Sequence, residues 1–101
     1  MKKIYQITDD KERLKFMNYR FFQANGYNEI NLKELGYTLV AKTDLEEMEI
    51  IFRESNTGNV NGCITLIAEG MHSLSVSDII IDQDEQSWFC DSIGFTKVKT
   101  L

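Results

Sequence analysis

The chain has 101 residues, 43% of them hydrophobic, and a formal net charge of −5 at pH 7. This length fits one compact domain with one hydrophobic core and leaves no room for two. No apolar run approaches the roughly 20 residues that a membrane span needs, and the polar start of the chain argues against a secretory signal, so we expect a cytoplasmic protein without a membrane partner.

The first part of the chain predicts two strands, a helix and a helical turn. Residues Lys3–Thr8 alternate as a strand does, and Tyr37–Thr43 alternates more regularly. Between them, apolar residues three or four positions apart predict a helix over 14–24, which Asn25-Gly26 ends. The segment 31–36 has a capping Asn, a Glu three residues later and a closing Gly, which together predict one short helical turn.

The second part predicts another helix and up to three strands. An apolar stripe over 44–55 predicts a helix with Asp44 as its N-cap and Glu47 in the reciprocal position. Cys63–Ala68 is apolar apart from one Thr and is short enough for a buried strand. Asp78–Asp82 and Ser87–Asp91 are β-branched or aromatic runs separated by a polar gap, which predicts a hairpin.

These elements predict a single α+β domain over residues 1–101. We expect a mainly antiparallel sheet of four to five strands with two helices packed on one face. The strand order does not follow from the sequence.

The charge is unevenly distributed. Residues 1–35 hold seven bases and five acids, whereas residues 36–101 hold four bases and eleven acids. Two acidic clusters are candidate partner-binding residues, because a negative face fits a basic partner. The alternative is that they are solvated side chains that keep a small protein soluble. The candidate residues are Glu46, Glu47, Glu49, Asp82, Asp84 and Glu85.

The segment 72–94 contains the residue types of a nucleophilic site, and it also contains turn signals. The catalytic alternative is a hydrolase or transferase centred on Cys90 and His72. No G-x-S-x-G elbow is present, and Cys63 and Cys90 lie in apolar runs without metal-type spacing, which favours reduced core cysteines. Ser75 and Asp78 are spaced like a capping box, which favours a structural role.

The sequence predicts no metal and no cofactor. His72 is the only histidine, and the nearby acids do not follow the spacing of a calcium loop. The glycines are isolated, so no loop is suited to hold a phosphate. Residues Lys11–Phe22 interleave bases with aromatics and form the alternative nucleic-acid-binding module, but the helix needs those aromatics for the core and the net charge of −5 opposes binding. We therefore expect no nucleic acid partner.

Two runs near the C-terminus resemble a family signature. His72-Ser73-Leu74-Ser75-Val76-Ser77-Asp78-Ile79-Ile80 is followed, after a polar gap, by Trp88-Phe89-Cys90-Asp91-Ser92-Ile93-Gly94-Phe95. This pattern is similar to the "SLSVSDVI … YYCDSFGF" signature of the YodL-like family. The segment between Asn56 and Met71 departs from the family pattern. The structural motif residues are Ser73, Ser75, Asp78, Asp91 and Gly94.

The resemblance implies a context rather than an activity. Members of the family occur in Firmicutes, phages and other mobile elements, and the family has no established enzymatic activity. The resemblance therefore implies a non-catalytic accessory protein of a mobile element that binds a host protein. A host defence nuclease would fit, because its nucleic-acid groove is basic and an acidic face can occupy it.

Overall fold

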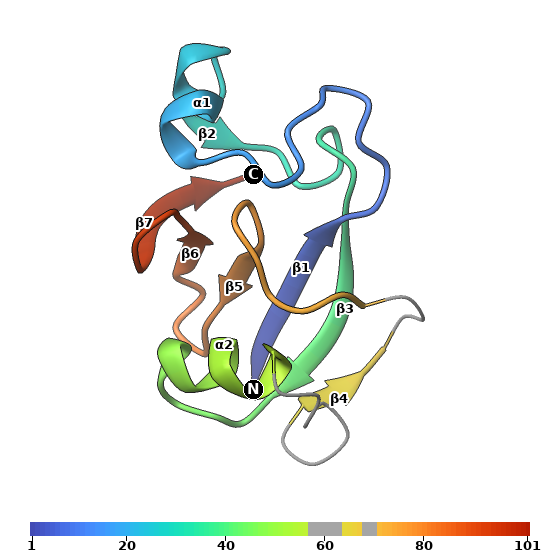
Figure 1. Ribbon diagram of the computed structural model, residues 1–101, viewed down its shortest axis with the longest axis vertical. Helices are drawn as coiled ribbons and strands as arrows, with labels where there is room; N and C mark the ends of the chain where they lie inside the picture. Colours follow the sequence, from blue (N-terminus) through green and yellow to red (C-terminus); the bar gives the residue numbers. More distant parts are fainter. Residues whose placement is uncertain (57–63, 68–70) are drawn as a thin grey trace.

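A computed structural model of the protein describes residues 1–56, 64–67 and 71–101. Within these residues it contains seven strands and two helices (Figure 1). They are β1 (Lys2–Ile7), α1 (Tyr19–Ala24), β2 (Glu29–Ile30), β3 (Tyr37–Thr43), α2 (Met48–Asn56), β4 (Ile64–Leu66), β5 (Ile79–Ile81), β6 (Ser87–Cys90) and β7 (Phe95–Thr100).

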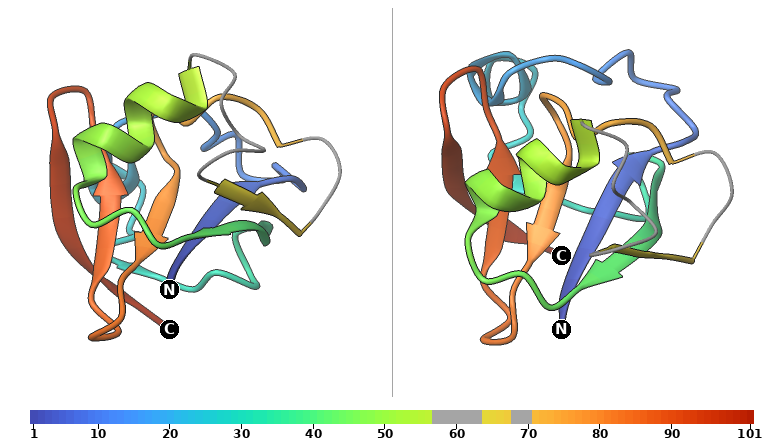
Figure 2. Two further views of the ribbon diagram at one scale, coloured as in Figure 1. Left: turned by 90° about the horizontal axis from the view of Figure 1, so that it is seen from below. Right: turned by 60° about the horizontal axis from the view of Figure 1, so that its bottom comes forward.

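The strands form one mixed sheet that curls into a half-barrel (Figure 2). Its strand order is β2-β7-β6-β5-β1-β3-β4, with β2 parallel to β7 and every other pair antiparallel. The prediction of a four- to five-stranded antiparallel sheet with helices on one face is therefore wrong. The predicted hairpin is confirmed, with Ile80 opposite Trp88, and the predicted bounds of Tyr37–Thr43 are those of β3.

The two helices lie on opposite faces of the sheet, and each contributes a side chain to a different apolar cluster. Phe22 of α1 packs at 4.9 Å, ring centroid to ring centroid, on Phe89 in a cluster that includes Ile79. Ile51 of α2 belongs to a second cluster that includes Ile80. Neighbouring residues in a strand point to opposite faces, so these two clusters lie on the two sides of β5. The single predicted core is divided in two by the sheet.

Both helices are shorter than predicted. Arg13 and Phe16 have φ angles of +56° and +69°, a left-handed conformation that a right-handed helix cannot include. Helix α1 therefore begins after Asn18, whose side-chain oxygen accepts a hydrogen bond from the Phe21 amide at 2.9 Å. Helix α2 begins four residues after Asp44, so the prediction of Asp44 as its N-cap is wrong.

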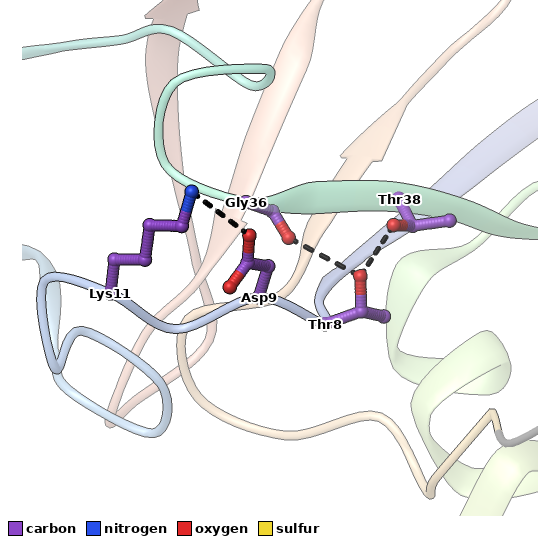
Figure 3. Close-up of polar contacts among 5 residues, drawn as sticks. All are labelled: Thr8, Asp9, Lys11, Gly36 and Thr38. Atoms are coloured by element: carbon purple, nitrogen blue, oxygen red, sulfur yellow. Dashed lines mark hydrogen bonds and ion pairs between the residues drawn. The ribbon is translucent and has the colours of Figure 1, made fainter.

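The predicted turn at 31–36 is confirmed and packs tightly against the end of β1. The side chain of Asn31 accepts a hydrogen bond from the Glu34 amide at 3.0 Å, as a cap does. Gly36 has a φ of +80°, and a Cβ atom there would lie 1.9 Å from the carbonyl oxygen of Asp9. The Gly36 carbonyl accepts a hydrogen bond from the Thr8 amide. It also accepts one from the Thr8 hydroxyl (Figure 3). Only glycine fits this position.

Figure 3 also shows the polar contacts that flank this turn. The Thr8 hydroxyl lies within hydrogen-bond distance of the Thr38 hydroxyl, and the Lys11 amine pairs with the Asp9 carboxylate at 3.4 Å. The Lys11 and Asp9 side chains are both largely exposed. Such a surface ion pair adds little stability, so backbone contacts to Gly36 are the main fastening here.

Candidate functional site

The two segments that carry the acidic clusters are far apart in the sequence and line a common hollow in the fold. The segment between β3 and α2 and the loop between β5 and β6 border one shallow hollow of about 160 Å³. Asp44 and Glu46 line it from one side and Gln83 from the other. We call this surface the acidic end; it consists of Asp44, Glu46, Glu47, Glu49, Asp82, Asp84 and Glu85.

A larger cleft of about 510 Å³ adjoins the hollow and shares Met1 and Gln83 with it. Lys3 and Tyr5 of β1, Ile81 of β5 and Thr100 of β7 contribute side chains to this cleft. Asp82 and Glu85 stand at its edge from the β5–β6 loop. No sequence pattern indicates this cleft, because it forms only when the sheet brings β1, β5 and β7, which are distant in the sequence, around one opening.

Asp82 has a structural task within the acidic end. Its carboxylate accepts hydrogen bonds from the Trp88 indole at 3.0 Å and from the amides of Asp84 and Gln86 at 2.9 and 3.0 Å. Burial alone would raise the pKa of Asp82, but these hydrogen bonds outweigh it and lower the pKa below its ordinary value. The charge of Asp82 is therefore held in place, while Asp84 and Glu85 are exposed at the tip of the loop.

Two lysines lie among the acids of this surface. Lys2 is only 5% exposed, and its amine donates a hydrogen bond to the carbonyl of Leu45 at 2.9 Å. Lys3 is exposed at the neighbouring cleft. The acidic end holds seven carboxylates by residue count, so these two cations offset only a part of its negative charge.

Asp78 of the signature segment is 1% exposed and belongs to a buried polar network. Its carboxylate accepts hydrogen bonds from the Ser75 amide at 2.8 Å and from Nε2 of Gln6 at 3.0 Å. Burial raises the pKa of Asp78 to about 7, although both hydrogen bonds oppose the rise. The reach of Asp78 back to Ser75 is as predicted. The capping role of the Ser75 side chain is not found, because its hydroxyl is buried without a partner among the described residues.

The other signature residues fasten distant segments to the sheet. The Ser73 hydroxyl donates to the Ser55 carbonyl of α2 at 3.3 Å. Asp91 accepts hydrogen bonds from the Tyr19 amide at 3.3 Å and from the Thr96 hydroxyl at 2.9 Å. Gly94 has a φ of +67° in the turn between β6 and β7. The signature thus reads as a set of structural anchors.

Sequence reasoning did not single out Ser77 and Tyr37 as anchors. The Ser77 hydroxyl accepts a hydrogen bond from the Phe16 amide at 2.9 Å, and the Ser77 carbonyl accepts one from the Tyr37 hydroxyl at 2.6 Å. These bonds join residues that are 61 and 40 positions apart in the sequence, so no local sequence pattern predicts them. Ser77 is buried and has a φ of +84°, and both features are visible only in the structure.

The two residues of the catalytic alternative are both committed to the fold. Cys90 is 2% exposed, and burial together with the nearby carboxylates of Asp78 and Asp91 raises the pKa of its thiol to about 12. Nδ1 of His72 lies 2.7 Å from the Ser73 carbonyl, and its Nε2 is buried without a partner among the described residues. Cys63 lies outside the described residues.

The aromatics of Lys11–Phe22 divide between the core and the surface. Phe22 is fully buried and Tyr19 is half-buried, as a core helix requires. Phe16 and Phe21 are 56% and 39% exposed, so the expectation that the core takes all of these aromatics is wrong. The left-handed residues 13 and 16 interrupt the helical path before α1, which leaves Phe16 outside the helix, whereas Phe21 lies within α1 and is exposed there.

Comparisons with known proteins identify a family. A model of the YodL-like domain matches residues 1–100. No curated protein and no solved structure matches the chain. Among the described residues, neither helix has the length and apolar character to cross a membrane, and no three metal-ligating side chains are grouped.

Proposed function

The chain belongs to the YodL-like domain family, and we propose that it is a non-catalytic protein-binding module whose acidic end binds a basic surface of another protein. The observation that carries this proposal is that the segment with Asp44 and Glu46 and the loop with Gln83, which bear the two acidic clusters, line one hollow. Charges that lie within about 8 Å of one another act together at physiological salt. A joint negative surface attracts a basic partner more strongly than either cluster alone.

The shape of the acidic end supports the same proposal. The hollow and the adjoining cleft are concave, so a protruding basic side chain can enter between carboxylates. The hydrogen bonds to Asp82 hold the β5–β6 loop in one conformation. A surface that is already ordered loses less conformational entropy on binding.

The kind of partner follows from the charge and from the family resemblance. A basic nucleic-acid groove is the type of protein surface that a compact acidic end fits. In a mobile-element protein, a host defence nuclease is the partner with such a groove. The proposed action is inhibition of that nuclease by occupation of the groove.

The test combines capture of a partner with charge reversal. The purified protein is immobilised, bacterial lysate is passed over it, and proteins that survive a moderate-salt wash are identified. We expect recovery of a basic protein, and we expect the triple variant Glu46→Lys, Glu47→Lys, Glu49→Lys to lose it. The matched control is Glu34→Lys, which reverses an exposed charge outside the acidic end.

A folded triple variant that still retains the same partner as strongly as the unchanged protein would count against the acidic end. Circular dichroism and thermal unfolding establish that each variant is folded. Binding that weakens steeply as salt rises is also expected, because the interaction is mainly between exposed charges.

The geometry gives less support to a hydrolase or transferase centred on Cys90 and His72. At neutral pH, a thiol with a pKa of about 12 is almost entirely protonated, and the protonated form is a poor nucleophile. The Cys90 side chain is also shielded from any substrate by its burial. A Cys90→Ser, His72→Ala double variant that keeps the partner bound would separate binding from chemistry.

A further inference from the structure

A second surface, formed by the loop before α1, by α1 itself and by the β6–β7 turn, exposes four apolar side chains. Phe16, Met17, Phe21 and Ile93 are 56%, 38%, 39% and 95% exposed. The loop and the turn are held together by the hydrogen bond from the Tyr19 amide to Asp91. We call this the apolar–basic surface; it comprises Phe16, Met17, Phe21 and Ile93 with Arg13, Lys15 and Arg20.

The backbone holds Phe16 in an outward position at an energetic cost. Its φ of +69° is rare for a bulky residue, because the left-handed conformation strains a residue that carries a large side chain. The Ser77 hydroxyl fixes the Phe16 amide, and the Asp10 carboxylate accepts from the amides of Leu14 and Lys15 at 2.7 and 3.2 Å. The fold therefore maintains an exposed aromatic just before helix α1.

The acids near this surface are engaged with other groups. Asp9 pairs with Lys11, and Asp10 accepts from two backbone amides. Glu12 interacts with the Tyr27 hydroxyl, and Asp91 accepts from two amides and from Thr96.

Of the three cations of the surface, only Lys15 acts on an acid, because its charge favours the ionised form of the buried Asp78. Arg13, Lys15 and Arg20 make no ion pair among the described residues. The Lys15 amine lies 5.2 Å from the centre of the Phe16 ring, which places a positive charge beside the exposed aromatic. The surface thus offers three cations without ion-pair partners among the described residues, beside apolar side chains and near carboxylates that hydrogen bond to neutral groups.

We propose that the apolar–basic surface binds an acidic, amphipathic segment of another protein. The apolar side chains of that segment pack on the exposed apolar side chains of the surface, and its carboxylates face the three cations. The cations are complementary to those carboxylates, and Phe, Met and Arg are residue types enriched in protein interfaces. Met17 and Ile93 have no ring on which a base could stack, so the surface suits a protein better than a nucleic acid.

This binding surface is separate from the acidic end. In Figure 1, α1 stands at one end of the long axis of the molecule, and α2 with the β5–β6 loop lies toward the other. The two surfaces have opposite charge and can be occupied at the same time. A module of this kind joins a basic protein to an acidic one.

The test uses a synthetic amphipathic helical peptide with leucine on one face and glutamate on the other. A second peptide with lysine in place of glutamate is the matched control probe. Binding is followed by two-dimensional amide NMR of the whole protein, which locates each contact. We expect the glutamate peptide to shift the amide signals of residues 13–21 and 91–94 while leaving residues 82–86 unchanged.

Variants give the second readout. Asn tolerates the left-handed conformation, so Phe16→Asn removes apolar area without straining the backbone. Phe16→Asn and Arg20→Glu are each expected to weaken peptide binding about tenfold, as the loss of an interface anchor does. Ile67→Thr is the control, because Ile67 is also well exposed, at 49%, but lies after β4.

Each alternative occupant has an outcome that overturns the proposal. A single-stranded oligothymidine that shifts the same amide signals at lower concentration than the glutamate peptide identifies a nucleic acid surface instead. Without peptide, self-association that rises with concentration in analytical ultracentrifugation and broadens the same NMR signals identifies a second copy of this chain as the occupant. Equal binding of both peptides, or no binding of the glutamate peptide, refutes the charge complementarity.

Discussion

Replacing Asp78 by Asn is expected to remove most of a pH-dependent loss of stability. Asp78 is buried, and its pKa is raised to about 7 in the folded protein, against about 4 for an ordinary Asp. Below pH 4 the carboxyl is protonated in both the folded and the unfolded chain, so it contributes no pH dependence there. Above pH 4 the unfolded chain releases its proton first, and stability falls until the folded chain ionises near pH 7.

The size of this effect follows from the difference between the two pKa values. A difference of about three units corresponds to about 4 kcal/mol of unfolding free energy, lost between pH 4 and 7. This is a large share of the roughly 5–15 kcal/mol that stabilises a typical domain. Asn cannot ionise, and its side-chain oxygen can still accept the hydrogen bonds from Gln6 and the Ser75 amide.

The assay is urea unfolding at a series of pH values from 4 to 8.5, followed by Trp88 fluorescence, for the unchanged protein and for Asp78→Asn. The free energy of Asp78→Asn minus that of the unchanged protein should rise with pH by up to about 1.4 kcal/mol per unit and level off above pH 7. Other titrating groups cancel in this difference. A difference that stays constant with pH would falsify the assignment of a raised pKa to Asp78.

Two further predictions concern the backbone and the thiol. Gly36→Ala places a methyl group against the carbonyl of Asp9 in a left-handed conformation, so it should lower the unfolding free energy by more than about 2 kcal/mol. The control Gly26→Ala also has a positive φ, of +89°, but an added Cβ there meets open space, so it should cost only about 1 kcal/mol. Equal losses of unfolding free energy in urea would contradict the contact with Asp9. In a Cys63→Ser background, Cys90 should react with a disulfide reagent at pH 8 only in denaturant, because its thiol is buried with a pKa of about 12, and rapid reaction of the folded protein would show that the thiol is accessible.

Local sequence patterns were sufficient for some elements of the fold. The alternation of Tyr37–Thr43 and the polar break between the runs that became β5 and β6 placed one strand and one hairpin correctly. The Asn31 cap and the closing Gly36 predicted their turn, because both depend on residues three to five positions apart. Charge composition identified both acidic clusters as candidates. Whether those clusters bind a partner stays a prediction.

The tertiary structure decided how these pieces combine. Strand β2 is only two residues long, and it exists because its backbone pairs in parallel with β7 near the other end of the chain, where local propensity has no influence. Helix α1 begins later than predicted because Phe16 and Tyr19 hydrogen bond to Ser77 and Asp91, which lie more than 60 residues away. The acidic end, the cleft and the apolar–basic surface each join segments that are distant in the sequence, because curling of the sheet brings loops together that share no local pattern. The sequence by itself therefore determined the chemistry that is available to this protein, and the long-range pairing of backbone groups determined where that chemistry meets.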